Sequence, residues 1–377
     1  MLSRKELLRS ACRALYAGAC APFLLTHDDA CALLAAQPDS PFIKPARHWK
    51  KLAGDSVRCQ LCPNECVISA GSRGACRVRM NLRGGLYTLV YGRLAAMHVD
   101  PIEKKPLYHV LPGSLAYSVA TAGCNMWCTF CQNWQISQAA PEAIDAAFVP
   151  PGQLSANARS KRCPVIAYTY NEPSVQFEYL VDSARVARSR GIRPVIISNG
   201  YINDAPGREL LGVLDAVKID LKAFTNSFYA KVCGGDLHNV LKTLERIKRN
   251  GTWLEIVVLV IPTLNDAPGE IREMTRWVRA NLSPDVPMHF TRFHAMYRIT
   301  NLPPTPVATL ERCRTIAREE GIRYPYVGNV PGHRWENTYC HSCGKQIIRR
   351  SGFYHVTSSI RNGACPHCAT RIPGVWA

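Results

Sequence analysis

Three cysteines stand close together in this chain of 377 residues, at Cys124, Cys128 and Cys131, with the spacing C-x3-C-x2-C. Closely spaced thiolates are soft ligands that suit an iron–sulfur cluster. A [4Fe–4S] cluster usually takes four protein ligands, and this run offers three. One iron would therefore stay open to a non-protein ligand. A structural zinc site that borrows a distant fourth ligand is the alternative interpretation.

Eight further cysteines form two groups, one before and one after this run. The first group follows C-x2-C-x3-C-x9-C and consists of Cys59, Cys62, Cys66 and Cys76. Four such thiolates could hold a second iron–sulfur cluster or zinc, or they could be unbound thiols. The second group follows C-x2-C-x21-C-x2-C and consists of Cys340, Cys343, Cys365 and Cys368. This spacing is typical of a zinc ribbon, although a rubredoxin-like iron site has the same ligands.

The use of cysteine also predicts a compartment. The chain has 17 cysteines, eleven of which lie in the three groups. Disulfide scaffolds are usually small secreted domains, so grouped thiols in a large chain indicate metal sites in a reducing compartment. We therefore expect a cytoplasmic protein. Because no apolar run approaches the roughly 20 residues that span a bilayer, we expect no membrane segment.

The net charge of +18 bears on partners and not on the fold. It suits an acidic protein, a phosphate-bearing substrate or nucleic acid, but an arginine-rich composition also arises without any such partner. Four arginines surround the last cysteine group, at Arg349, Arg350, Arg361 and Arg371. This module could dock nucleic acid or an acidic protein. A stabilising cap with a solvated basic face is the alternative.

The region from about 115 to 330 supplies elements that can position the cysteines. Apolar, strand-like runs alternate there with amphipathic helical segments. The six runs lie at 117–120, 165–168, 194–197, 216–220, 254–260 and 288–290. Repeated β-then-α units predict parallel strands joined by crossover helices. The predicted fold class is α/β, and six units favour a partial (β/α)6 barrel over an open sheet.

Parallel strands carry their active groups at their carboxyl ends, and polar segments follow several of these runs. The cysteine triad follows the first run. The later segments contribute Asn171, Glu172, Ser198, Asn199, Asp220, Lys222 and His294. These segments also have purely structural explanations. They could supply an acid in the first turn of a helix, an Asn-Gly turn, and a salt bridge between Asp220 and Lys222.

The sequence predicts four parts in the chain. They are a helical extension at 1–57, a Cys-rich segment at 58–112, the barrel at 113–332 and a zinc-ribbon-like module at 333–377. Residues 3–9 faintly resemble a twin-arginine export signal, but the apolar stretch that follows is interrupted by Arg13. We favour a helix from about Arg4 to Leu25. In the loop at 99–109, Lys104, Lys105 and His109 are further candidates to meet a substrate.

The triad and the polar segments together resemble the signature of radical S-adenosylmethionine (SAM) enzymes. The resemblance implies a [4Fe–4S] cluster held by three thiolates, with the fourth iron chelated by the amine and carboxylate of SAM. It implies reductive cleavage of SAM to methionine and a 5′-deoxyadenosyl radical, which abstracts hydrogen from a substrate. An electron donor such as flavodoxin or ferredoxin is implied as a partner.

The resemblance also implies roles for single residues. Glu172 stands where the family has a Gly-Gly-Glu-type motif that contacts the SAM amino group, although Tyr170 and Asn171 replace both glycines. Ser198 and Asn199 resemble the segment that binds the SAM ribose.

The remaining polar segments resemble a narrower set, the glycyl-radical-enzyme activases. Asp220 and Lys222 match an Asp-x-Lys motif whose residues face SAM, and His294 matches a late histidine motif that could face SAM or substrate.

From about Cys59 to Trp376 the chain is similar to one subfamily, the AmmeMemoRadiSam-system radical SAM proteins, which are related to pyruvate formate-lyase activating enzyme. The stretches that carry this resemblance lie at 59–66, 99–109, 131–134, 327–332 and 373–376. The subfamily is named for neighbouring AMMECR1-like and MEMO-like proteins, which the resemblance implies as partners. It is not named for a reaction, so no substrate follows.

Three functions are therefore weighed. The first is a radical SAM enzyme that acts on a small molecule, a peptide or RNA. The second is an activase that makes a glycyl radical on a partner protein. The third, from another class, is a basic zinc-ribbon protein that binds nucleic acid and has an inactive barrel. The extra cysteine groups add surface beyond the barrel and favour the first over the second, and the intact triad argues against the third.

Overall fold

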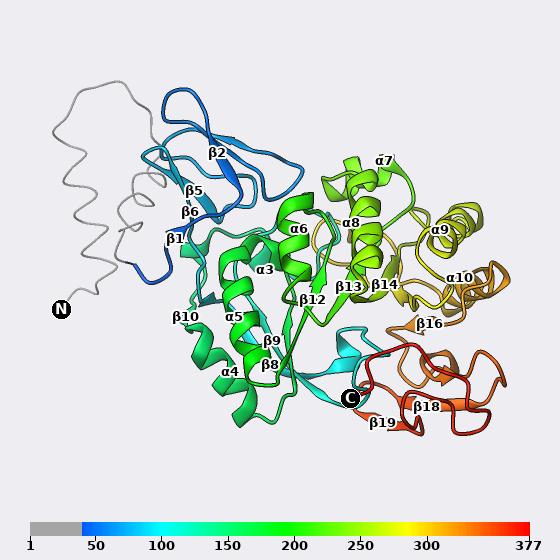
Figure 1. The fold of residues 1–377 in the computed structure, drawn as a ribbon. Helices are drawn as coiled ribbons and strands as arrows, with labels where there is room; N and C mark the ends of the chain where they lie inside the picture. Colours follow the sequence, from blue (N-terminus) through cyan, green and yellow to red (C-terminus); the bar gives the residue numbers. More distant parts are fainter. Residues whose placement is uncertain (1–39) are drawn as a thin grey trace, which may run out of the picture.

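The computed structural model describes residues 40–377 (Figure 1). The expected helix from Arg4 to Leu25 and the export-signal alternative lie outside these residues. The described part of the expected helical extension forms short strands instead, β1 (Lys44–Pro45) and β2 (Trp49–Lys51). Proline lacks a backbone N–H and its ring clashes inside a helix, so Pro41 and Pro45 disfavour helix here.

A mixed sheet of eight strands forms the centre of the protein, in the order β16-β15-β14-β13-β12-β11-β9-β8. Neighbouring strands from β9 to β16 are parallel, and β8 is antiparallel to β9 at one edge. The strands are β8 (Ala96–Pro101), β9 (Leu115–Ala120), β11 (Val165–Tyr168), β12 (Arg193–Ser198), β13 (Ala216–Asp220), β14 (Trp253–Val260), β15 (Met288–Arg292) and β16 (Pro325–Gly328).

The six strands predicted from the sequence are all present, as β9 and β11 to β15. The predicted α/β class is therefore confirmed. The two edge strands of the sheet were not expected. Because β8 and β16 each pair on one side only, the hydrogen-bonded sheet is open.

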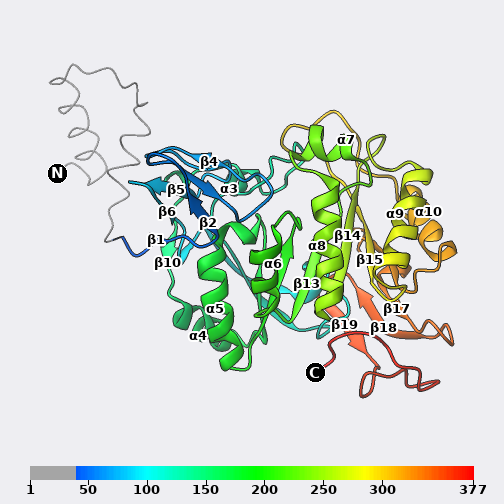
Figure 2. The ribbon, with the colours of Figure 1, turned by 45° about the horizontal axis from the view of Figure 1, so that its top comes forward.

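Six helices connect the parallel strands, and each connection moves one strand along the sheet. Right-handed crossovers that always advance in the same direction place their helices on the same face. Figure 2 shows α5, α6 and α8 side by side on that face. The helices are α4 (Pro151–Ser160), α5 (Phe177–Ser189), α6 (Asp204–Leu211), α8 (Leu237–Asn250), α9 (Pro268–Asn281) and α10 (Val307–Glu319). None of the helices within residues 40–377 has the length and apolarity needed to cross a bilayer.

Helix α8 illustrates how the sequence sets these elements. The side chain of Asp236 accepts a hydrogen bond from the backbone N–H of Asn239 and caps the first turn. Gly251 ends the helix in the left-handed conformation at a φ of 77°. The apolar positions at helical spacing are buried, at Leu237, Val240, Leu244 and Ile247. Burying each such side chain contributes roughly 1.5–3 kcal/mol, so this stripe fixes α8 against the sheet.

Shorter elements connect the large ones. They are the helices α3 (Trp134–Ser137) and α7 (Asn226–Phe228), the 3₁₀ turns η1 (Ile102–Lys104), η2 (Pro141–Ala143), η3 (Pro173–Gln176) and η5 (Arg334–Glu336), and the π-helical turn η4 (Tyr229–Cys233).

Small sheets flank the central sheet at two places. The N-terminal part pairs β1-β6-β5, β2-β3-β4 and β7-β10, and the C-terminal part pairs β17-β18-β19. Figure 1 shows the two parts on opposite sides of the central sheet. The remaining strands are β3 (Val57–Cys59), β4 (Val67–Ile68), β5 (Arg79–Leu82), β6 (Gly85–Thr88), β7 (Arg93–Leu94), β10 (Ala147–Phe148), β17 (Thr338–Tyr339), β18 (Gln346–Ser351) and β19 (His355–Ser358).

Candidate active site

The cysteine triad lies in the loop that leaves β9 at its carboxyl end. The backbone N–H groups of Trp127 and Thr129 donate to the carbonyls of Cys233 and Val232, each at 2.9 Å. These bonds join the triad loop to the end of η4. Gly234 follows directly, and a Cβ at this position would lie 2.1 Å from the Trp127 ring. The loop is therefore held by backbone hydrogen bonds and by a contact that only glycine permits.

This loop forms one wall of a cavity of about 780 Å³ at the carboxyl ends of the parallel strands. Every residue that the sequence predicted to bind the triad's cluster or its cofactor lines this one cavity. These residues are Cys124, Cys128, Cys131, Asn171, Glu172, Ser198, Asn199, Asp220, Lys222 and His294. Their individual roles stay predictions, but the fold brings them together from five different strand ends.

Comparison with known proteins gives the family of the chain. Residues 118–278 match the Radical SAM superfamily, a span that begins in β9 and ends in α9. The uncharacterized protein MJ0808 of Methanocaldococcus jannaschii is 41% identical over 332 residues, which cover 88% of this chain and 99% of that protein. The chain belongs to the family of MJ0808 and carries a radical SAM domain.

More distant relatives and solved structures were also found. The uncharacterized protein MJ0674 of the same archaeon is 25% identical over 215 residues, covering 54% of this chain and 57% of that protein. A radical SAM methyltransferase from Sphaerobacter thermophilus is 14% identical, with a TM-score of 0.48 and 86% of each chain covered. A domain of pyruvate-formate lyase-activating enzyme from Bacteroides vulgatus is 16% identical, with a TM-score of 0.39, covering 43% of this chain and 98% of that chain.

A radical SAM domain implies a [4Fe–4S] cluster and SAM, and the surroundings of the three thiols fit such a cluster. The backbone N–H of Met126 lies 3.5 Å from the Cys124 sulfur. The side-chain amide of Asn199 lies 4.0 Å from the same sulfur, and the hydroxyl of Ser137 lies 3.3 Å from the Cys131 sulfur. Hydrogen bonds to the ligand sulfurs are one of the means by which a protein tunes such a cluster.

Glu172 is buried in the radical SAM domain, and its carboxylate accepts three hydrogen bonds. The donors are the backbone N–H of Ser174 at 3.0 Å, the hydroxyl of Ser198 at 2.9 Å and the backbone N–H of Asn199 at 2.7 Å. The first bond caps η3, as the structural explanation predicts for an acid at a helix start. Burial raises the pKa of Glu172, and these hydrogen bonds oppose the rise. Glu172 therefore ties the segment after β11 to the segment after β12.

Tyr170 and Asn171 show how this chain manages without the two glycines of the motif it resembles. Tyr170 has a left-handed φ of 71°, a conformation that glycine adopts readily and other residues adopt at a cost of about 1–2 kcal/mol. The side-chain amide of Asn171 donates to the carbonyls of Thr121 and Gly123, at 2.8 and 2.6 Å. Asn171 therefore holds the start of the triad loop, while its carbonyl oxygen is buried without a partner in residues 40–377.

Asp220 lies between two lysines at the carboxyl end of β13. It pairs with Lys218, and the ammonium of Lys222 lies 3.4 Å from its other oxygen. Burial raises the pKa of Asp220, but the two cations outweigh burial and hold the pKa below its usual value. Burial lowers the pKa of Lys222, but Asp220 and the thiol of Cys128 outweigh it and hold the pKa well above its usual value. The predicted salt bridge between Asp220 and Lys222 is therefore present, and it borders the cavity.

The environment of Cys128 differs from that of the other two triad thiols. A hydrogen bond with the buried Cys233 and the nearby ammonium of Lys222 together lower the pKa of Cys128. Burial raises the pKa of Cys124 and Cys131. The protein thus favours the thiolate form of Cys128, the form that binds metal.

Lys218 and Phe353 are among the residues of the cavity wall that sequence reasoning missed. Lys218 precedes Asp220 by two positions, and alternate residues of a strand point to one face, so the strand pattern could have revealed it. Phe353 comes from the turn between β18 and β19, and no local pattern indicates that this turn reaches the cavity.

The three candidates from the loop at 99–109 separate in the structure. Lys104 and Lys105 line the cavity. His109 does not, and the expectation that it meets a substrate is wrong. Its ring nitrogens lie 2.6 Å from the carbonyl of Pro373 and 2.7 Å from the hydroxyl of Tyr326, and its backbone N–H donates to Glu255. His109 therefore links Pro373 of the C-terminal module to strands β14 and β16 of the central sheet.

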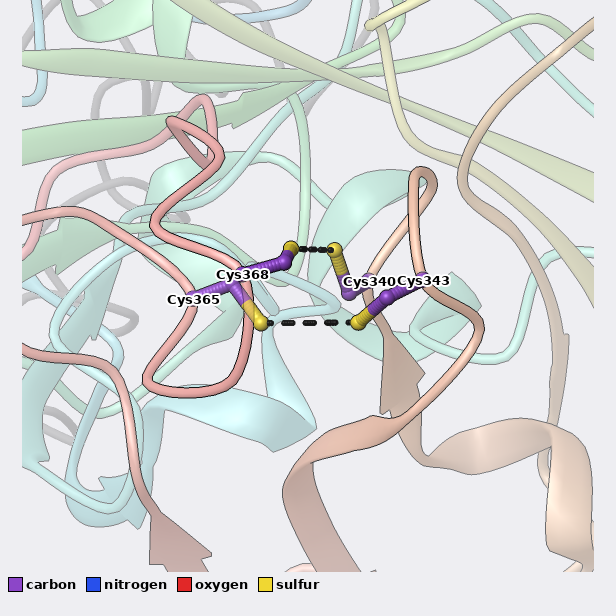
Figure 3. Close-up of side chains that lie close together, drawn as sticks. All are labelled: Cys340, Cys343, Cys365 and Cys368. Carbon is purple, nitrogen blue, oxygen red and sulfur yellow. Dashed lines mark hydrogen bonds between the residues drawn. The ribbon is translucent and has the colours of Figure 1, made fainter.

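The C-terminal cysteines converge to the size of a single metal site. In Figure 3 they face one another as two pairs from two loops. The Cys340 and Cys368 sulfurs are 3.6 Å apart, and the Cys343 and Cys365 sulfurs are 3.8 Å apart. All four lie within 4.8 Å of one another. A tetrahedral zinc with bonds of about 2.3 Å places its sulfurs about 3.8 Å apart, so this geometry fits zinc.

Proposed function

We propose that this radical SAM protein is an enzyme that reductively cleaves SAM at a [4Fe–4S] cluster held by Cys124, Cys128 and Cys131. When bound, the cluster and SAM supply a 5′-deoxyadenosyl radical for hydrogen abstraction from a substrate. The observation that supports this best is that the triad and the seven predicted cofactor residues line one cavity. The cavity therefore brings together residues that lie up to 170 positions apart in the chain.

The residues around the triad act by fixing polar groups before a ligand arrives. Glu172 holds the backbone of Asn199 and the hydroxyl of Ser198 at the cavity wall. Asn171 holds the carbonyl of Gly123 and with it the start of the triad loop. The ion pair of Asp220 with its two lysines supplies charges that need little reorganisation when a polar cofactor binds. The roles assigned to these residues toward SAM are part of the proposal.

The proposal extends to the rest of the molecule. In this proposal the eight-stranded sheet is the partial (β/α)6 barrel, with β16 added at one edge, and the C-terminal module is a zinc ribbon. The substrate is a small molecule, a peptide or RNA that enters between the loop at 104–106 and Phe353, both of which line the cavity. Activation of a glycyl-radical partner protein is the alternative reaction. Flavodoxin or ferredoxin is the electron donor, in the cytoplasm.

The test is anaerobic reconstitution of the full chain with iron and sulfide, followed by dithionite and SAM. We expect 5′-deoxyadenosine and methionine from the wild type and none from Cys128→Ala. Cys163→Ala is the matched control, because Cys163 is also buried but precedes β11, at the end of that strand opposite the cavity. Equal product from both variants would contradict the assignment of the triad.

A further inference from the structure

A second group of thiols adjoins the triad loop on the side away from the cavity. Cys59, Cys62, Cys66 and Cys76 line one small pocket between the N-terminal strands and the radical SAM domain. Asn125, the residue next to Cys124, lines the same pocket. A Cβ at Gly123 would lie 2.4 Å from the carbonyl oxygen of Cys76, so the two cysteine loops touch through their backbones.

The sulfurs of these four cysteines are less closely grouped than the sulfurs of the C-terminal group. Within residues 40–377, the C-terminal cysteines are the only group of three or more His, Cys, Asp or Glu ligand atoms that converges to the size of one ion. The N-terminal four line one pocket without converging so closely, and the triad behaves in the same way. A cubane of four irons is larger than one ion, so its ligand sulfurs stand further apart than the sulfurs around zinc.

Donors aimed at these sulfurs give a second and independent indication. The guanidinium of Arg79 is fully buried, and its Nη1 lies 3.3 Å from the Cys59 sulfur. Its Nη2 donates to Glu178 at 2.6 Å. The backbone N–H of Ala75 donates to the Cys66 sulfur at 3.4 Å. Glu178 balances the charge of Arg79, and the second N–H group of the guanidinium points at the Cys59 sulfur, where it can stabilise a thiolate ligand.

We propose that Cys59, Cys62, Cys66 and Cys76 hold a second [4Fe–4S] cluster, next to the triad and distinct from it. Its four thiolates would occupy all four irons, so this cluster offers no open iron to SAM or to a substrate. The N–H and guanidinium donors on its sulfurs stabilise the negative charge of the cluster. This inference goes beyond the proposed function and does not depend on SAM cleavage.

The experiment counts metal in the full chain after anaerobic reconstitution with iron, sulfide and zinc. The wild type should carry about eight irons, and the triple variant Cys124→Ala/Cys128→Ala/Cys131→Ala about four irons with four sulfides. The electron paramagnetic resonance signal of the dithionite-reduced triple variant should be unchanged when SAM is added. Adding Cys59→Ala and Cys62→Ala to the triple variant should remove the remaining iron, whereas adding Cys313→Ala, at another buried thiol, should not.

The triple variant decides the question because it leaves the four cysteines intact. If the triple variant binds no iron but carries a second zinc per chain, the pocket is a zinc site. If it binds neither iron nor a second zinc, the four cysteines of the pocket are unbound thiols. Either result would overturn the proposal. The proposed function is measured separately by 5′-deoxyadenosine from the wild type, so the two can fail independently.

Discussion

Replacing Gly123 by alanine should disturb the contact between the two cysteine loops. Gly123 has a left-handed φ of 88°, and a Cβ would lie 2.4 Å from the Cys76 carbonyl oxygen and 2.6 Å from a methyl group of Val78. The left-handed conformation costs about 1–2 kcal/mol for a residue with a Cβ. Overpacking costs about 1–3 kcal/mol more, because the backbone oxygen has to move. We expect Gly123→Ala to lower the free energy of unfolding by about 2–5 kcal/mol.

Gly251 offers a matched control in the same chain. It has a similar φ of 77°, but nothing lies within 4 Å of the Cβ position. Gly251→Ala should therefore lower the free energy of unfolding only by the cost of the left-handed conformation, about 1–2 kcal/mol. The difference between the free energies of unfolding of the two variants therefore measures the cost of the clash between the two cysteine loops.

The assay combines urea unfolding with the formation of 5′-deoxyadenosine. A displacement of reacting groups by about 1 Å can cost on the order of 100-fold in rate, so Gly123→Ala should lose activity by about that factor. Gly251→Ala should remain close to wild type, because α8 ends far from the triad in the chain and its C-terminal glycine lines no part of the cavity. If the two variants are equally stable and equally active, the reasoning about the interlocked loops is wrong.

Two further predictions concern the C-terminal module. Burial lowers the pKa of His109 from 6.5 to about 4, so its contribution to stability is complete above pH 6.5 and is lost as the pH falls toward 4. The free energy of unfolding should fall by about 3 kcal/mol over this pH range. Urea unfolding should show this loss for the wild type and not for His109→Gln. Identical pH profiles of the two proteins would contradict the prediction. Cys340→Ser/Cys368→Ser should lose one zinc per chain and destabilise the module, as measured by metal analysis and thermal unfolding. Retention of zinc by this variant, or iron in place of zinc in the wild type, would refute the assignment.

The alternation of strands and helices could be predicted because six buried strands have strong apolar runs. The two edge strands could not. Strand β16 begins with Pro325 and ends with Gly328, two residue types that are disfavoured in strands, so its sequence resembles a loop. Strand β8 exposes part of its surface and lies within the Cys-rich segment, so its composition resembles neither a buried strand nor an amphipathic one.

The cavity was predictable because parallel strands bring their carboxyl ends together. Each predicted residue ends a strand or follows one, so topology alone places it at the rim. His109 shows the limit of this reasoning. Its ring and backbone contacts join positions 146 to 264 residues apart in the chain, and no local pattern carries that information. The same holds for Phe353, which reaches the cavity from the C-terminal module.

The central claim is tested most directly by one reaction of the reconstituted wild type. The protein, shown by analysis to carry its iron and sulfide, is mixed anaerobically with SAM and dithionite, and 5′-deoxyadenosine is measured over time. We predict 5′-deoxyadenosine and methionine in equal amounts, dependent on the reductant. Intact SAM in the presence of a fully assembled triad cluster would contradict the account.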